Sequence, residues 1–261
     1  MEDSPQPPSP PELAPPVIEL ARPWGPWGTL GLGLLICVIW ILAQTVIAVV
    51  MVFGNFLVDR NAGEQLQYDG DLLGMATVGS GIAAIIAIFF FVWLRKYPSA
   101  DYLGLRFPWR WWIHFPLWLG ITYGLGHLFG FLAPFFDREE IPEFMQKAFL
   151  STDYMILLWL GVAVMAPLFE EFFFRGFLYA GWRRSALGWT GTAVLTSLLW
   201  AIIHVQYGMY EITCIFVLGL VFSAAREITG SLWIPIAMHG LNNAIAIYVT
   251  QSEMTKAALG G

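Results

Sequence analysis

The residues in this chain whose types and spacing could do chemistry are charged groups set in apolar surroundings. Glu170, Glu171 and Arg175 interrupt an almost wholly apolar stretch that runs from Met155 to Ala180. A carboxylate at membrane depth is costly, so each such residue predicts a functional site. The spacing of Glu171 and Arg175, four residues apart, suits a salt bridge that would hold a carboxylate in place.

Three further polar residues occupy the same kind of position. His204 ends the apolar run 195–203, while His239 and Asn243 lie inside the run 232–249. His239 and Asn243 are four residues apart and would share one helix face. Two acids, two imidazoles and a carboxamide in three consecutive apolar segments favour a site that activates water. Each part also has a plainer interpretation, as a buried ion pair, an interfacial histidine or a hydrogen-bonded bridge between helices.

The composition explains why these groups would lie at membrane depth. Hydrophobic residues make up 57% of the chain and charged residues only 12%. In a soluble domain, charged residues make up about a quarter. Apolar runs of about 20 residues leave no polar face for the helices of a soluble protein. We therefore expect an all-α, polytopic transmembrane helical bundle. The net charge of −6 comes mostly from the tails and loops and says little about partners, while the lack of a basic stripe argues against nucleic acid.

Seven apolar runs are candidate spans, and an eighth is possible. The runs are 27–56, 72–94, 111–136, 154–183, 187–204, 210–225 and 232–249. The fourth is too long for one straight span, because about 30 residues at about 1.5 Å each exceed the hydrocarbon thickness. Pro167 predicts a break or kink in it, just before the two glutamates. If the chain turns at 183–188, Glu170 and His204 lie at about the same height and can meet.

Basic residues predict the orientation. The connections after the second and fourth runs should be cytoplasmic and the acidic loop 137–143 external, which puts the N-terminus inside. An odd number of spans would put the C-terminus outside. We expect a multi-pass protein of the bacterial cytoplasmic membrane. The basic residues of the two connections are Arg95, Lys96, Arg106, Arg110, Arg183 and Arg184.

The order of these motifs resembles the CAAX-protease and bacteriocin-processing family, known as the CPBP or ABI intramembrane proteases. The sequence EEFFFR at 170–175 matches the family's EExxxR motif. Residues 200–204 are similar to its FxxxH motif, with Trp200 in place of Phe, and residues 239–243 are similar to HxxxN. The connection 226–236, REITGSLWIPI, resembles the family's Thr-Gly-Ser-Leu-Trp-x-Pro stretch. The resemblance covers roughly residues 154–247.

The resemblance implies an intramembrane endopeptidase that acts on a membrane-associated peptide or protein tail. Glu170 would be the general base on a water, and His204 would share that role or orient the water. His239 and Asn243 would stabilise the oxyanion, with Glu171 and Arg175 in support. The domains would be a disordered Pro-rich tail (1–24), an N-terminal transmembrane region (25–150), a CAAX-protease-like catalytic core (151–250) and a C-terminal tail (251–261).

Metal dependence stays open on the sequence, with no cofactor favoured. Glu170, His204 and His239 could hold zinc or another divalent metal and leave a position for water. The chain has no HExxH, however, and a metal-free mechanism gives His239 another role at the oxyanion. Cys37 and Cys214, the two cysteines, offer neither zinc spacing nor a disulfide framework.

Two rival functions remain beside a protease. One is a non-proteolytic membrane scaffold or bacteriocin self-immunity protein that keeps the same fold. The other is a proton-coupled transporter, which predicts an internal repeat that the sequence does not show. The expected partners of a protease are the lipid bilayer and a substrate with a membrane-associated tail.

Overall fold

Helices account for nearly all of the ordered backbone in this computed structural model. It describes residues 24–58, 69–138 and 141–260, and it has no strand in those ranges. The all-α fold class is therefore confirmed. The proposed Pro-rich tail, apart from its last residue, lies outside the described residues.

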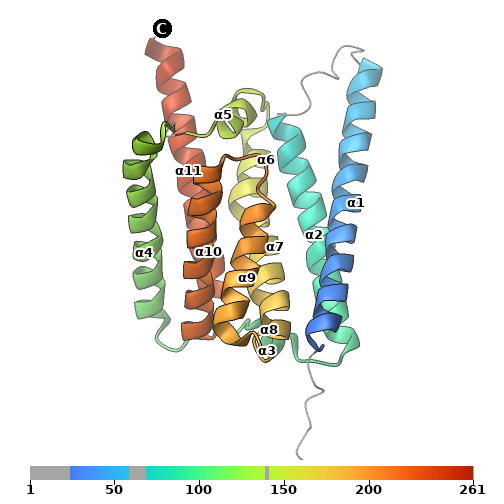
Figure 1. The fold of residues 1–261 in the computed structure, drawn as a ribbon. Helices are drawn as coiled ribbons and strands as arrows, with labels where there is room; N and C mark the ends of the chain where they lie inside the picture. Colours follow the sequence, from blue (N-terminus) through green and yellow to red (C-terminus); the bar gives the residue numbers. More distant parts are fainter. Residues whose placement is uncertain (1–23, 59–68, 139–140, 261) are drawn as a thin grey trace, which may run out of the picture.

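Each of the seven apolar runs is helical, and the long helices lie side by side in one bundle (Figure 1). Short helices α3 and α5 lie at opposite ends of it. The helices outside the fourth run are α1 Pro26–Val58, α2 Gly70–Leu94, α3 Ser99–Leu103, α4 Trp111–Leu132 with a 3-10 turn at Ala133–Phe136, α5 Glu143–Leu150, α9 Gly188–Ile202, α10 Met209–Thr229 and α11 Trp233–Gly260.

Length and composition make five of the described helices able to cross a membrane, namely α1, α2, α4, α10 and the helix formed by the fourth run. The apolar helix α9 has only 15 residues. The chain is thus an integral membrane protein of several spans, while the number of seven to eight stays a prediction. Through these helices the protein associates with the lipid bilayer.

The fourth run forms one helical column whose hydrogen-bond register changes twice. It consists of α6 Met155–Trp159, a π-helical segment Leu160–Met165, α7 Ala166–Glu171, a second π-helical segment Phe172–Leu178 and α8 Tyr179–Trp182. The backbone stays helical from Met165 to Phe172, so the column does not break at Pro167, and a kink there stays a prediction. The π-helical hydrogen bonding of Leu160–Met165, just before Pro167, accommodates the proline in the helix. Such segments occur frequently at functional sites.

Close backbone contact with α2 fixes the position of this column. A Cβ atom on Gly74 would lie 2.6 Å from the carbonyl oxygen of Leu157, and one on Gly161 would lie 2.9 Å from Gly74 Cα. Only residues without a side chain allow helices to approach in this way. In the first turn of α2, the Asp71 carboxylate accepts a hydrogen bond from the backbone N–H of Tyr154, 2.9 Å away, just before α6 begins.

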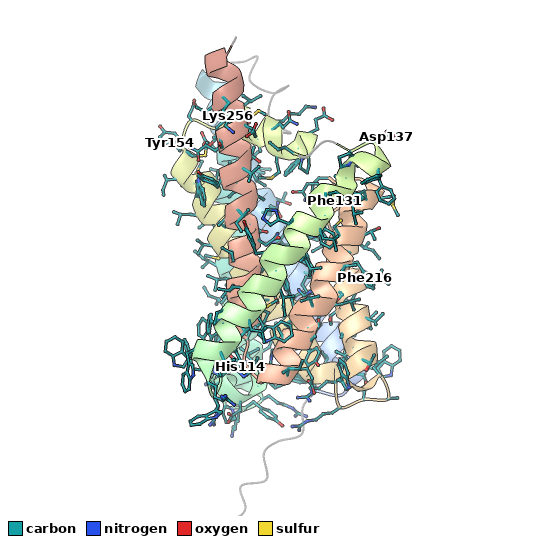
Figure 2. All side chains as sticks on the ribbon, turned by 90° about the vertical axis from the view of Figure 1, so that its left-hand side faces the viewer. His114, Phe131, Asp137, Tyr154, Phe216 and Lys256 are labelled. Carbon is teal, nitrogen blue, oxygen red and sulfur yellow. The ribbon has the colours of Figure 1, made fainter. Side chains whose placement is uncertain are left out.

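The two ends of the bundle differ in charge. The connections on both sides of α3 and the α8–α9 turn, which carry the basic residues of the predicted cytoplasmic loops, lie at one end together with the start of α1 (Figure 1). Figure 2 shows His114 near that end, and Asp137, Tyr154 and Lys256 near the other. The C-terminus lies at the second end (Figure 1). Which end faces the cytoplasm stays a prediction.

Candidate active site

Side chains from three segments meet at the carboxylate of Glu170. The indole N–H of Trp200, on α9, donates a hydrogen bond to Glu170 Oε2. The imidazole of His239, on α11, places its Nε2 3.9 Å from the same oxygen. The Glu170 side chain keeps 14% of its surface exposed, so it is accessible to a small reactant.

A fully buried ion pair lies directly behind this carboxylate. Arg175 Nη1 is 2.9 Å from Glu171 Oε1, and both side chains are 0% exposed. Arg175 Nη2 also donates to the carbonyl of Gly219 on α10, at 3.1 Å. The predicted pairing of Glu171 with Arg175 is present. Burying both charges is costly, and Glu171 Oε2 and Arg175 Nε have no hydrogen-bond partner among the described residues.

Glu171 makes a second contact, with His239. His239 Nδ1 lies 3.0 Å from Glu171 Oε1. A carboxylate can only accept, so Nδ1 carries the proton and donates it. The other ring nitrogen, Nε2, then faces Glu170. Glu171 therefore sets the orientation of the imidazole as well as neutralising Arg175.

Aromatic rings enclose these groups. The guanidinium carbon of Arg175 lies 4.6 Å from the centre of the Trp200 ring and 5.6 Å from that of Phe222. The His239 ring lies 5.1 Å from Trp200 and 5.5 Å from Phe222, centre to centre. Contacts of a cation with aromatic faces are attractive, and more so away from water. The buried charge thus holds the two rings that flank the catalytic histidine candidate.

His204 reaches the site through Trp200. Helix α9 ends at Ile202, and the backbone N–H of His204 turns to the carbonyl of Ala201, at 3.2 Å. Helix ends leave carbonyl groups without helical partners. The carbonyl of Trp200 accepts from His204 Nδ1, at 2.7 Å. That leaves His204 Nε2 unprotonated in the neutral ring and able to accept a proton.

The structure gives Asn243 a partner in the first π-helical segment. Its Nδ2 donates to the carbonyl of Val162, at 2.8 Å. This carbonyl lacks a helical partner because the Ala166 N–H donates to Gly161 instead, and Pro167 has no N–H. Asn243 therefore satisfies the acceptor that the register change exposes. One of its two amide hydrogens remains for another acceptor.

The alternative zinc set does not form as a cluster. Among the described residues, no group of three His, Cys, Asp or Glu side chains is arranged to hold a metal ion. Of the three residues in this set, Glu170 and His239 approach each other, with Nε2 3.9 Å from Oε2. The residues as placed do not fit a three-ligand site, so no chemical step is assigned to a metal.

Sequence reasoning missed three participants in the site. Trp200 enters the motif only as a replacement for Phe, although a buried indole N–H usually finds an acceptor, and that signal could have identified it. Tyr207 follows the end of α9, and its ring stacks on that of His204 with the centres 6.2 Å apart. Gly219 accepts from Arg175, and a backbone carbonyl of this kind carries no sequence signal.

Comparison with known proteins identifies a matching family for the segment that contains all these motifs. Residues 152–245 match the family model described as type II CAAX prenyl endopeptidase Rce1-like. The resemblance to CAAX proteases is confirmed over this segment. The Rce1-like family is a protease family, which supports peptidase activity in general.

One curated relative is similar in sequence, but its name states no function. This chain is 38% identical over 101 residues to an Escherichia coli protein named "Uncharacterized 24.3 kDa protein". The match covers 37% of this chain and 46% of that protein, so it spans about half of the relative's length. No solved structure matches this chain.

Proposed function

We propose that this protein is an intramembrane endopeptidase that hydrolyses a peptide bond in a membrane-associated peptide or protein tail. The observation that carries the proposal is the carboxylate of Glu170, held by the Trp200 indole with His239 Nε2 3.9 Å from the same oxygen. A fixed, partly exposed carboxylate beside an oriented imidazole suits the activation of water. The Rce1-like segment around it supports peptide hydrolysis.

In the first step, water attacks the scissile carbonyl carbon. Glu170 removes a proton from the water as the new C–O bond forms, and its Oε1 is the oxygen not bound by Trp200. His204 orients the same water through Nε2, because Nδ1 is committed to the Trp200 carbonyl. The electron pair of the C=O bond moves to oxygen and gives a tetrahedral oxyanion.

His239 and Asn243 stabilise this oxyanion. Protonated at Nε2, His239 donates to the negative oxygen while Glu171 balances the charge of the ring at Nδ1. The second amide hydrogen of Asn243 is the other donor. Loss of one such donor costs about 10²- to 10³-fold in kcat in other hydrolases.

In the second step the tetrahedral intermediate collapses. The C–N bond breaks, and the protonated Glu170 carboxyl gives its proton to the departing amine. The products are a new carboxyl terminus and a new amino terminus, and Glu170 returns to its carboxylate form. The buried Glu171–Arg175 pair takes no part in these proton transfers and positions His239 throughout.

The test compares wild-type protein with Glu170→Ala and Glu170→Gln in proteoliposomes that contain a membrane protein extract. New peptide termini should appear with the wild type and be lost with both variants. Arg106→Gln, a change at an exposed position between α3 and α4, is the control and should cleave normally. Equal cleavage by Glu170→Ala would overturn the proposal, and rescue of a cellular phenotype by that variant would favour a scaffold.

A further inference from the structure

A polar cleft of about 730 Å³ lies beside the candidate site. Its lining comes from two parts of the chain, the described residues around the start of α5 and those between α9 and α10. Both are at the end of the bundle where α5 and the C-terminus lie (Figure 1). Its lining includes Arg138, Phe144, Gln206, Tyr207 and Glu211. A volume of this size matches ligand sites in proteins.

Tyr207 joins this cleft to the site. Its ring lines the cleft and also stacks on the His204 ring at an interplanar angle of 15°. The Phe144 ring meets it edge-on with the centres 5.9 Å apart. Burial and then the negative charges of Glu170 and Glu211 raise the pKa of Tyr207 to about 12, so its hydroxyl is neutral under physiological conditions.

Two other sides of Glu170 are poor routes for a peptide. Trp200 and Phe222 pack with His239 on one side, and the fully buried Arg175 lies behind Glu171. An extended peptide carries backbone N–H and C=O groups that are costly to expose to lipid. A polar cleft supplies partners for those groups, and an apolar helix surface does not.

We propose that the scissile segment of the substrate reaches Glu170 through this cleft as an extended chain. Tyr207 forms the inner wall of the cleft and positions the His204 ring. The substrate class is thus an extended polypeptide segment next to a membrane anchor, presented at the end of the bundle that carries α5. This inference rests on the proposed protease function.

Blocking the cleft with a bulky thiol reagent tests the route. The starting protein is the full chain with Cys37→Ala and Cys214→Ala, which must still cleave. Into it we would introduce Gln206→Cys, in the cleft, or Arg184→Cys, an exposed position at the opposite end of the bundle. Each is assayed before and after reaction with a polyethylene-glycol maleimide.

Modification of Gln206→Cys should lower kcat/KM at least about tenfold, because a blocked route removes productive binding. Modification of Arg184→Cys should change it by less than about twofold. Full activity after complete modification of Gln206→Cys would overturn the route and leave the proposed function intact. Absence of cleavage by the wild type would instead refute the protease function.

The positioning role of Tyr207 has its own measurement. Tyr207→Phe keeps the stacked ring and should retain kcat within about twofold, whereas Tyr207→Ala should lose about tenfold in kcat. A fall in kcat larger than any rise in KM would separate positioning of His204 from loss of binding surface. Full kcat in Tyr207→Ala, or loss of activity in Tyr207→Phe, would contradict a role for the ring.

Discussion

A single carboxylate oxygen, Oε1 of Glu171, lies 3.0 Å from His239 Nδ1 and 2.9 Å from Arg175 Nη1. It therefore couples the column that carries both glutamates to α11. The second glutamate of the EExxxR motif is the orienting group for the histidine of HxxxN. The sequence predicts its pairing with Arg175, while its contact with His239 becomes visible only in the fold.

This coupling predicts an unusual stability pattern for Glu171→Gln. The amide can still accept from His239, but Arg175 is left as an uncompensated buried charge, so unfolding should become easier by about 3–5 kcal/mol. The double variant Glu171→Gln/Arg175→Met removes that charge and should regain much of the loss. Thermal unfolding in detergent measures both. A double variant less stable than the single one would contradict this explanation.

Trp200→Phe should separate packing from hydrogen bonding. Phe keeps an aromatic ring beside His239 and restores the residue of the FxxxH motif, but it removes the donor to Glu170 Oε2. We expect stability within about 1–2 kcal/mol of wild type and a fall in kcat of about 3- to 10-fold, since Glu170 loses a fixed orientation. Steady-state cleavage and thermal unfolding are the measurements.

The matched control for Trp200 is Trp200→Ala, which also removes the ring and should cost about 3–5 kcal/mol of stability. Wild-type kcat in Trp200→Phe would show that the hydrogen bond does not contribute to catalysis.

Asn243 should have two separable functions. Asn243→Ala removes the donor to the Val162 carbonyl, and a buried acceptor left unpaired should cost about 1–3 kcal/mol of stability. It also removes the proposed oxyanion donor, so kcat should fall by about 10²- to 10³-fold. Adding Pro167→Ala supplies a backbone N–H near the Val162 carbonyl. The double variant should regain stability and remain inactive. Recovery of cleavage by the double variant would remove Asn243 from the oxyanion site.

The metal-free mechanism predicts that chelation leaves cleavage unchanged. Purified wild-type protein treated with a chelator should keep its kcat, and elemental analysis should find far less than one zinc per chain. Arg106→Gln, treated in parallel, controls for effects of the reagent on the protein surface. Loss of activity on chelation, with recovery on adding zinc, would contradict the metal-free mechanism.

Hydropathy predicted the helices well because each long apolar run can satisfy its backbone groups in lipid only as a helix. The run 232–249 is indeed α11, which continues to Gly260. The two π-helical segments escaped prediction, since a shift from i+4 to i+5 hydrogen bonding leaves hydropathy unchanged. For the same reason the partner of Asn243 could not be found from sequence.

The depth of the site residues along the bundle could be predicted from the sequence, but the rotation of the helices about their axes could not. Counting residues from the turn at 183–188 predicts that Glu170 and His204 lie at similar depth. The structure links both to Trp200, through its indole and its carbonyl. The rotation of α9 about its axis, which decides whether Trp200 or His204 faces Glu170, depends on packing that one sequence does not reveal.

The length of the chain between α6 and the two glutamates, which includes the first π-helical segment, does not tolerate insertion or deletion in its α-helical parts. One residue added or removed there would rotate the residues on one side by about 100° relative to the other. Either the glycine contact with α2 or the alignment of Glu170 with His239 would then be lost. The additional residue of the π turn is the spacer that lets one helix satisfy both neighbours.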